Sequence, residues 1–124
     1  MGRTIIFVGI GGMIGSVCRF LSYSLAAHLL PFAFPFGTLG VNILGSFVMG
    51  AAFGLSERYM WIDRDWRMFL TAGFCGGFTT FSAFAMENVE LLIDKQYATF
   101  AGYSTASFVL CIAAAFAGLM ITRS

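Results

Sequence analysis

Charged residues are scarce in this chain of 124 residues. They make up 10% of the sequence, whereas a typical globular protein has about 25%. Hydrophobic residues make up 59%. A soluble domain of this size has a large surface for its volume and needs many polar side chains to cover it. The shortage of charge therefore excludes an ordinary soluble domain and predicts a protein that faces lipid.

Other shortages exclude further classes of function. The net charge is only +1 and no basic cluster is available to neutralise phosphates, so a nucleic-acid partner is not expected. His28, the only histidine, lies at the edge of a predicted loop, where no nucleophile and base can be assembled around it. The sequence therefore does not predict an enzyme. The cysteines are odd in number and all lie in apolar stretches, so they do not form a disulfide framework. They are Cys18, Cys75 and Cys111.

Three long stretches carry no formal charge, and they cover residues 20–56, 68–86 and 96–122. A helix that crosses a membrane needs about 20 mostly apolar residues. The first stretch is too long for one span and contains Pro31 and Pro35, which mark a connection. We therefore predict a single transmembrane domain, all α-helical, with four spans. The predicted spans cover about residues 4–28, 37–56, 67–93 and 98–121.

The first span shares one feature with a cleaved signal peptide, because Arg3 precedes an apolar run. A secretory signal carries an apolar core of about 7–15 residues. The apolar stretch here is longer, is rich in glycine and contains Arg19. We therefore expect the first span to remain in the protein.

The basic residues in the loops and at the ends of the spans are distributed unevenly. Four spans place both chain ends on one side of the membrane, and the opposite side holds only Lys95 among the loop basics. Loops rich in lysine and arginine stay in the cytoplasm. The bias predicts cytoplasmic ends for a multi-pass protein of the plasma (inner) membrane. The basic residues on the side of the chain ends are Arg3, Arg58, Arg64, Arg67 and Arg123.

Each predicted span carries a pair of small residues four positions apart. Lipid gives helices no hydrophobic reason to associate, so close packing of small residues has to hold them together. We therefore expect the helices to approach closely and the chain to form a dimer or a larger assembly. The pairs are Gly11 and Gly15, Gly50 and Gly54, Gly73 and Gly77, and Ala114 and Gly118.

Polar side chains within the first two spans need partners. Arg19 stands about two thirds of the way along the first span, where arginine is costly unless it finds a partner or its long side chain reaches the interface. Asn42 stands inside the second span, and its amide both donates and accepts hydrogen bonds. Asn42 either contacts a transported ion or makes an ordinary hydrogen bond between helices.

The fourth span carries a row of polar side chains. Tyr103, Ser107 and Cys111 recur every four residues, which places them along one face of a helix. This row either lines a hydrated path or bonds back to carbonyls of its own helix, as serine commonly does.

The third span contains the run GFCGGFTTFSAF at residues 73–84. Its glycines and adjacent threonines favour a helix less than leucine or alanine does, so we predict a helix broken within the membrane. Broken helices persist at that depth only where the freed carbonyls are buried in protein or line a wet or ion-filled cavity. Such carbonyls can coordinate Na⁺. The alternative for this run is a glycine-rich packing face.

Phe81 and Phe84 follow within the same run. They are three residues apart and share one face of a helix. The edge of an aromatic ring is electropositive. Two ring edges that point inward can therefore stabilise a small anion without binding it too tightly to leave.

Three runs together resemble the Fluc/CrcB family of fluoride channels. They are GGMIGSVCRF at residues 11–20, GTLGVN at residues 37–42 and GFCGGFTTFSAF at residues 73–84. They occur in the family's order and at its spacing, and the match spans the whole chain. The resemblance implies a four-helix subunit that forms an antiparallel, dual-topology homodimer in the lipid bilayer. It also implies two pores that export cytoplasmic fluoride by passive diffusion and protect the cell from fluoride toxicity.

The resemblance further implies roles for individual residues. The fluoride path would contain Phe81, Phe84, Asn42, Tyr103, Ser107, Ser82 and Cys111. Arg19, Thr38 and Glu87 match polar residues of the vestibule or of the structural framework. Gly76 and Thr79 match residues whose backbone carbonyls, from both subunits, hold a structural Na⁺ that is not transported. Cys111 stands where family members often have serine or threonine.

Two other classes of protein are less favoured by the residues. A small multidrug-type exporter is also a dimer of four-helix subunits, but proton coupling needs a carboxylate within the membrane. The first two spans contain no acid, and Glu87 and Glu90 lie late in the third. An assembly subunit that transports nothing would leave the ion-site features of the third span without a purpose.

Overall fold

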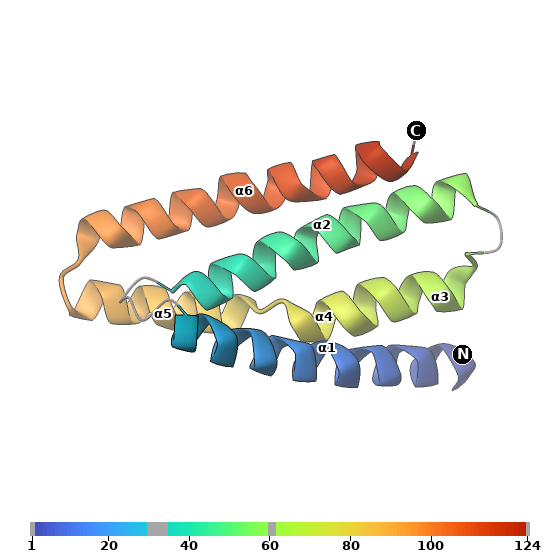
Figure 1. Cartoon of the computed structure of the whole chain (residues 1–124), viewed down its shortest axis with the longest axis horizontal. Helices are drawn as coiled ribbons and strands as arrows, with labels where there is room; N and C mark the ends of the chain where they lie inside the picture. The colour runs from blue at the N-terminus through green and yellow to red at the C-terminus, as the bar shows by residue number, and fades with distance from the viewer. Residues whose placement is uncertain (1, 30–34, 60–61, 124) are drawn as a thin grey trace.

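The computed structural model describes residues 2–29, 35–59 and 62–123, which form helices and no strand (Figure 1). Four helical spans are long and apolar enough to cross a membrane, which confirms the prediction. They are α1 (Gly2–Leu29), α2 (Phe36–Arg58), the third span at Arg64–Ile93 and α6 (Tyr97–Arg123). Pro35 directly precedes α2, whereas Pro31 lies outside the described residues.

The third span is built from several pieces. It contains α3 (Arg64–Met68), a π-helical segment η1 (Phe69–Cys75), α4 (Gly76–Phe78) and α5 (Phe81–Ile93). Thr79 and Thr80 stand between α4 and α5 in extended conformations, with ψ angles of 160° and 120°. The predicted break in the third helix is therefore present, and it falls at the two threonines.

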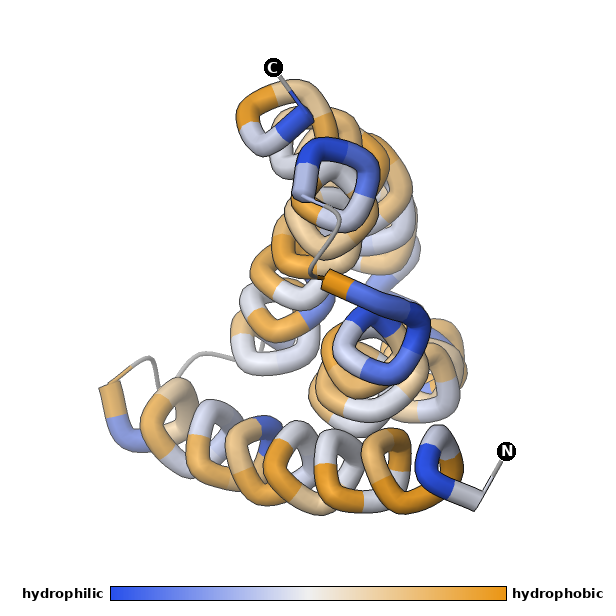
Figure 2. Tube along the Cα trace, turned by 90° about the vertical axis from the view of Figure 1, so that its right-hand side faces the viewer, coloured by the Kyte–Doolittle hydropathy of each residue, from blue (hydrophilic) through white to orange (hydrophobic). Residues whose placement is uncertain are grey.

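Neighbouring spans alternate in direction (Figure 1). The α1 helix and the third span run one way, and α2 and α6 run the other, so both termini lie at the end that holds the α2–α3 connection. Figure 2 views the molecule from this end and shows hydrophilic residues gathered there. Two ion pairs tie elements together at this end. Arg3 Nε lies 2.9 Å from Asp65 Oδ2, and Arg123 Nε lies 3.3 Å from Glu57 Oε2.

Glycines bring the helices into backbone contact. Gly50 and Gly118 lie in the α2–α6 interface, where a β-carbon on Gly50 would meet the Ala115 carbonyl and one on Gly118 would meet the Phe47 carbonyl. Gly15 of α1 faces the backbone of the third span in the same way. These contacts confirm the predicted close approach of helices. They are made within one chain, so the predicted oligomer has to rest on other features.

The α2–α6 contact leads to a test of packing. We expect Gly50→Ala to lower the free energy of unfolding by about 1–3 kcal/mol, the usual cost of overpacking, because the added methyl group collides with the Ala115 carbonyl. Gly40→Ala is the matched control on the same helix, since a β-carbon there meets nothing within 4 Å. Thermal unfolding in detergent measures both variants, and equal stability of the two would contradict this account of the interface.

Candidate functional site

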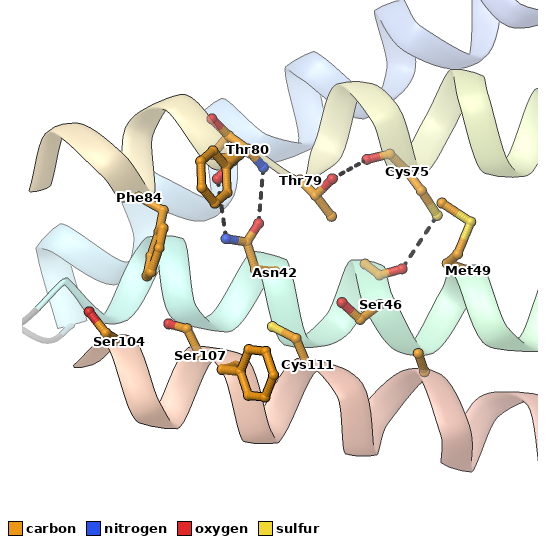
Figure 3. A pocket seen from close by; sticks show the side chains of 14 residues that line it. Asn42, Ser46, Met49, Cys75, Thr79, Thr80, Phe84, Ser104, Ser107 and Cys111 are labelled. Atoms are coloured by element: carbon orange, nitrogen blue, oxygen red, sulfur yellow. Dashed lines mark hydrogen bonds between the residues drawn. The ribbon is translucent and has the colours of Figure 1, made fainter. Parts of the chain in front are cut away.

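An open groove of about 440 Å³ lies between α2, α6 and the break in the third span (Figure 3). The structure brings most of the expected path residues to this groove from three separate elements. Of the expected residues, α2 contributes an amide, α6 contributes a hydroxyl and a thiol, and the third span contributes two aromatic rings. The lining therefore consists mostly of neutral donors and apolar surface. The expected residues that line the groove are Asn42, Thr79, Phe81, Phe84, Ser107 and Cys111.

Asn42 holds the break open with both atoms of its amide (Figure 3). The Thr80 N–H donates to Asn42 Oδ1 at 2.9 Å, and Asn42 Nδ2 donates to the Thr80 carbonyl at 3.2 Å. The interhelical hydrogen bond left open by the sequence is therefore present. In a continuous helix the Thr80 N–H would donate to the Gly76 carbonyl. Asn42 takes this donor away and so leaves the Gly76 carbonyl without it.

The side chain of Thr80 likewise takes the helical donor away from the Thr79 carbonyl. The hydroxyl of Thr80 caps α5 by accepting from the Ala83 N–H at 3.2 Å. In a continuous helix that N–H would donate to the Thr79 carbonyl. The two carbonyls that the resemblance assigns to a cation, Gly76 and Thr79, are thus the two whose helical donors are diverted by side chains.

Aromatic rings run in series from the break towards α6. The ring centroids of Phe81 and Phe84 are 5.6 Å apart, and those of Phe84 and Tyr103 are 5.0 Å apart. Phe81 is 78% exposed, whereas Tyr103 is fully buried. Phe84 therefore lies between a ring that projects from the chain and a ring in its interior.

Ser107 places a hydroxyl group in the groove without a partner. The residue is 8% exposed, and its Oγ is buried and makes no hydrogen bond with any described residue. Several other hydroxyls on the spans bond back to the carbonyl four residues earlier, as Thr79 does to Cys75 at 2.7 Å. A buried hydroxyl without a partner loses its bonds to water and is costly. The Ser107 hydroxyl is therefore free to donate to a ligand in the groove.

Thr38, Glu87 and Tyr103 form a cluster behind the groove. Thr38 Oγ1 donates to Glu87 Oε2 at 2.8 Å, and the Tyr103 hydroxyl donates to Glu87 Oε1 at 2.9 Å. Glu87 thus connects α2, α5 and α6 through its two oxygens. Tyr103 does not line the groove itself, but its ring contacts that of Phe84, which does.

Arg19 and Ser82 lie in a different place from the other expected residues. They line a second cavity, of about 420 Å³, together with Tyr23 and Thr80. Thr80 lines both cavities, so the break separates the two. The structure therefore places Ser82 with Arg19 beside α1, and it does not bring Ser82 to the groove.

Three polar residues of the groove were not singled out as path residues by the sequence patterns: Ser46, Thr80 and Ser104. Ser46 follows Asn42 by four residues, so the helical repeat could have placed it on the same face. Among the described residues, no three His, Cys, Asp or Glu side chains come together to hold a metal, so a cation site there would have to use carbonyl oxygens.

Four apolar spans, the third of them broken at Thr79 and Thr80, define a small multi-pass integral membrane protein. A family model described as CrcB-like protein, Camphor Resistance (CrcB), matches residues 6–119. The chain belongs to this family.

Curated relatives match the chain over almost its whole length. Three of them are named fluoride-specific ion channel FluC. The relative from Leptospira interrogans serovar copenhageni is 38% identical, and the match covers 98% of this chain and 96% of the relative. The relative from Azobacteroides pseudotrichonymphae is 41% identical, with 99% and 98% covered. The relative from Campylobacter jejuni serotype O:2 is 39% identical, with 99% and 100% covered.

Proposed function

We propose that this chain is a fluoride-specific ion channel that exports cytoplasmic fluoride by passive diffusion and so protects the cell from fluoride toxicity. The names of its full-length relatives support fluoride as the ion. The observation that carries the proposal is the unpartnered Ser107 hydroxyl, which is buried in a groove beside Asn42 and Phe84. A small anion with high affinity for hydroxyl donors would satisfy that group.

The chemistry of the groove suits conduction. An ion path needs sites that are favourable enough to enter and weak enough to leave. The described residues that line the groove include no arginine, lysine or carboxylate. Ser107 and Asn42 offer neutral donors, and Phe84 offers an electropositive ring edge. Fluoride would pass between these groups without meeting a fixed positive charge, and the groove offers no carboxylate for a proton-coupled exporter.

A second copy of the chain would complete the path. The groove is open along one side, and Phe81, which lines it, is 78% exposed. We infer an antiparallel homodimer, with one subunit in each orientation, in which each groove is closed by the partner. Two grooves would then make two pores. The arginine-rich end of the chain favours one orientation, whereas an antiparallel pair requires both, so the pairing has to be reached against this bias.

Gly76 and Thr79 are suited to hold a structural Na⁺. Both carbonyls lack the N–H that a continuous helix would supply, and a freed carbonyl at membrane depth needs a partner. Hard cations prefer oxygen ligands such as carbonyls. In a dimer the two carbonyls from each copy would surround one ion, which would stabilise the interface and would not be transported.

Anion efflux from liposomes tests the function directly. We expect liposomes that contain the purified protein to release fluoride rapidly and to release chloride no faster than empty liposomes do. The measurement uses ion-selective electrodes after the membrane potential is set with a potassium ionophore. Comparable fluxes of the two anions, or no flux of either, would overturn the proposal.

A further inference from the structure

Ser46 of α2 presents a second hydroxyl group to the groove (Figure 3). It lies one helical turn after Asn42, on the same face of α2. Some helical hydroxyls bond back to their own helix, as Thr71 does to the Arg67 carbonyl at 2.8 Å and Thr122 to the Gly118 carbonyl at 2.7 Å. Others donate to a neighbouring element, as Thr38 does to Glu87 at 2.8 Å. Ser46 makes no such bond to any described residue, so its proton is available to a ligand.

The position of Ser46 along the groove follows from the parallel packing of α2 and α6 (Figure 1). Gly50 faces Ala115, and Gly118 faces Phe47. These two contacts place Ser46 about three residues beyond the level of Cys111, which is roughly 4–5 Å along the helix axis. Figure 3 shows the same order, with Ser104, Ser107 and Cys111 following one another along α6 and Ser46 farther on.

Among the residues of α6 that line the groove, the hydroxyl donors end at Ser107. The next residues of α6 that line the groove with side chains of the same row are Cys111 and Ala115. A thiol is a weak donor and a methyl group is no donor at all. A small anion that moves past Ser107 along α6 would therefore lose its hydrogen bonds, which is costly away from water.

We propose that Ser46 donates its hydroxyl proton to fluoride at the position beyond Ser107, and that it does there what a hydroxyl at position 111 would otherwise do. This inference rests on the proposed channel function. It assigns a fluoride site that draws on α2 as well as α6. The donor path then crosses from one helix to the other just beyond Cys111, where the residues of α6 that line the groove have no hydroxyl.

The unitary fluoride current in planar bilayers tests this assignment. We expect Ser46→Ala to lower that current about fivefold, the effect of losing one neutral hydrogen bond of ordinary strength. Cys111→Ser should restore most of the current in the Ser46→Ala background, because it returns a hydroxyl to the same stretch of the groove. Thr105→Val is the matched control, since Thr105 is an exposed hydroxyl residue on α6 that does not line the groove.

Each outcome has one meaning. A Ser46→Ala current within twofold of the parent current would overturn the assignment. So would a reduced current that Cys111→Ser does not restore, because a purely structural role of Ser46 gains nothing from a hydroxyl on α6. A parent protein that carries no fluoride current contradicts the proposed function itself and is distinguished from both by measuring the parent first.

Discussion

A Phe84→Ile channel is expected to lose fluoride efflux while it still assembles. The Phe84 ring lines the groove between Phe81 and Tyr103, and its electropositive edge is the group offered to the anion. Isoleucine keeps an apolar side chain but has no such edge. A desolvated cation on the face of a ring gains about 2 kcal/mol from the ring quadrupole. With a similar value for an anion at the positive edge, loss of the contact slows efflux by about thirtyfold, and Phe81→Ile is expected to act in the same way.

The control for this prediction is Phe116→Ile. Phe116 is an exposed phenylalanine on α6 and does not line the groove, so its replacement should leave the rate unchanged. Efflux from liposomes gives the rate, and size-exclusion chromatography in detergent gives the assembly state. Unchanged fluoride efflux in Phe84→Ile would remove the ring from the path.

Asn42→Ala is expected to disturb assembly as well as transport. Without the amide, the Thr80 N–H loses its acceptor and can return to the Gly76 carbonyl, which would close the break towards a continuous helix. Two hydrogen bonds of about 1 kcal/mol each are lost. If Gly76 helps to hold Na⁺ at a dimer interface, the dimer of this variant should need more Na⁺ to form, on the order of tenfold more.

The variant Ser107→Ala separates the effect on transport from the effect on assembly. The Ser107 hydroxyl makes no hydrogen bond with any residue that the structure describes, so this variant should conduct fluoride more slowly while its dimer keeps the Na⁺ dependence of the parent. The dimer fraction is measured by chemical cross-linking in a series of Na⁺ concentrations at constant ionic strength. An Asn42→Ala dimer with the parent's Na⁺ dependence would show that Asn42 does not govern the cation site.

The spans and the break could be predicted because they depend on local composition. Stretches without charge mark the membrane segments, and the ends of the helices fall within three residues of the expected ones. Glycine and paired threonines weaken a helix wherever they occur, so the interruption at Thr79 and Thr80 was visible in the sequence. The π-helical segment Phe69–Cys75 could not be predicted in the same way, because amino-acid composition does not distinguish a π-helix from an α-helix.

The positions of side chains around the break were harder to predict. Ser82 was grouped with Phe81 and Phe84 by motif, yet successive residues of a helix point about 100° apart, and Ser82 lies in the second cavity. The spacing of the glycine pairs predicts that two helix backbones approach each other. It does not show whether those two helices belong to one chain or to two. The partner of Asn42 depends on how α2 packs against the break, which is a tertiary contact.

The break in the third span also has an electrostatic consequence. A helix carries about half a positive charge at its amino end and half a negative charge at its carboxyl end. The α4 helix ends at Phe78 and α5 begins at Phe81, so two opposite poles face each other across two residues, at a depth where the low dielectric strengthens both. Without a bound ion, the potentials of these two poles largely cancel. A cation that neutralised the carboxyl end of α4 would leave the amino end of α5 uncompensated, and the groove beside Phe81 would then attract negative ions without containing a charged side chain.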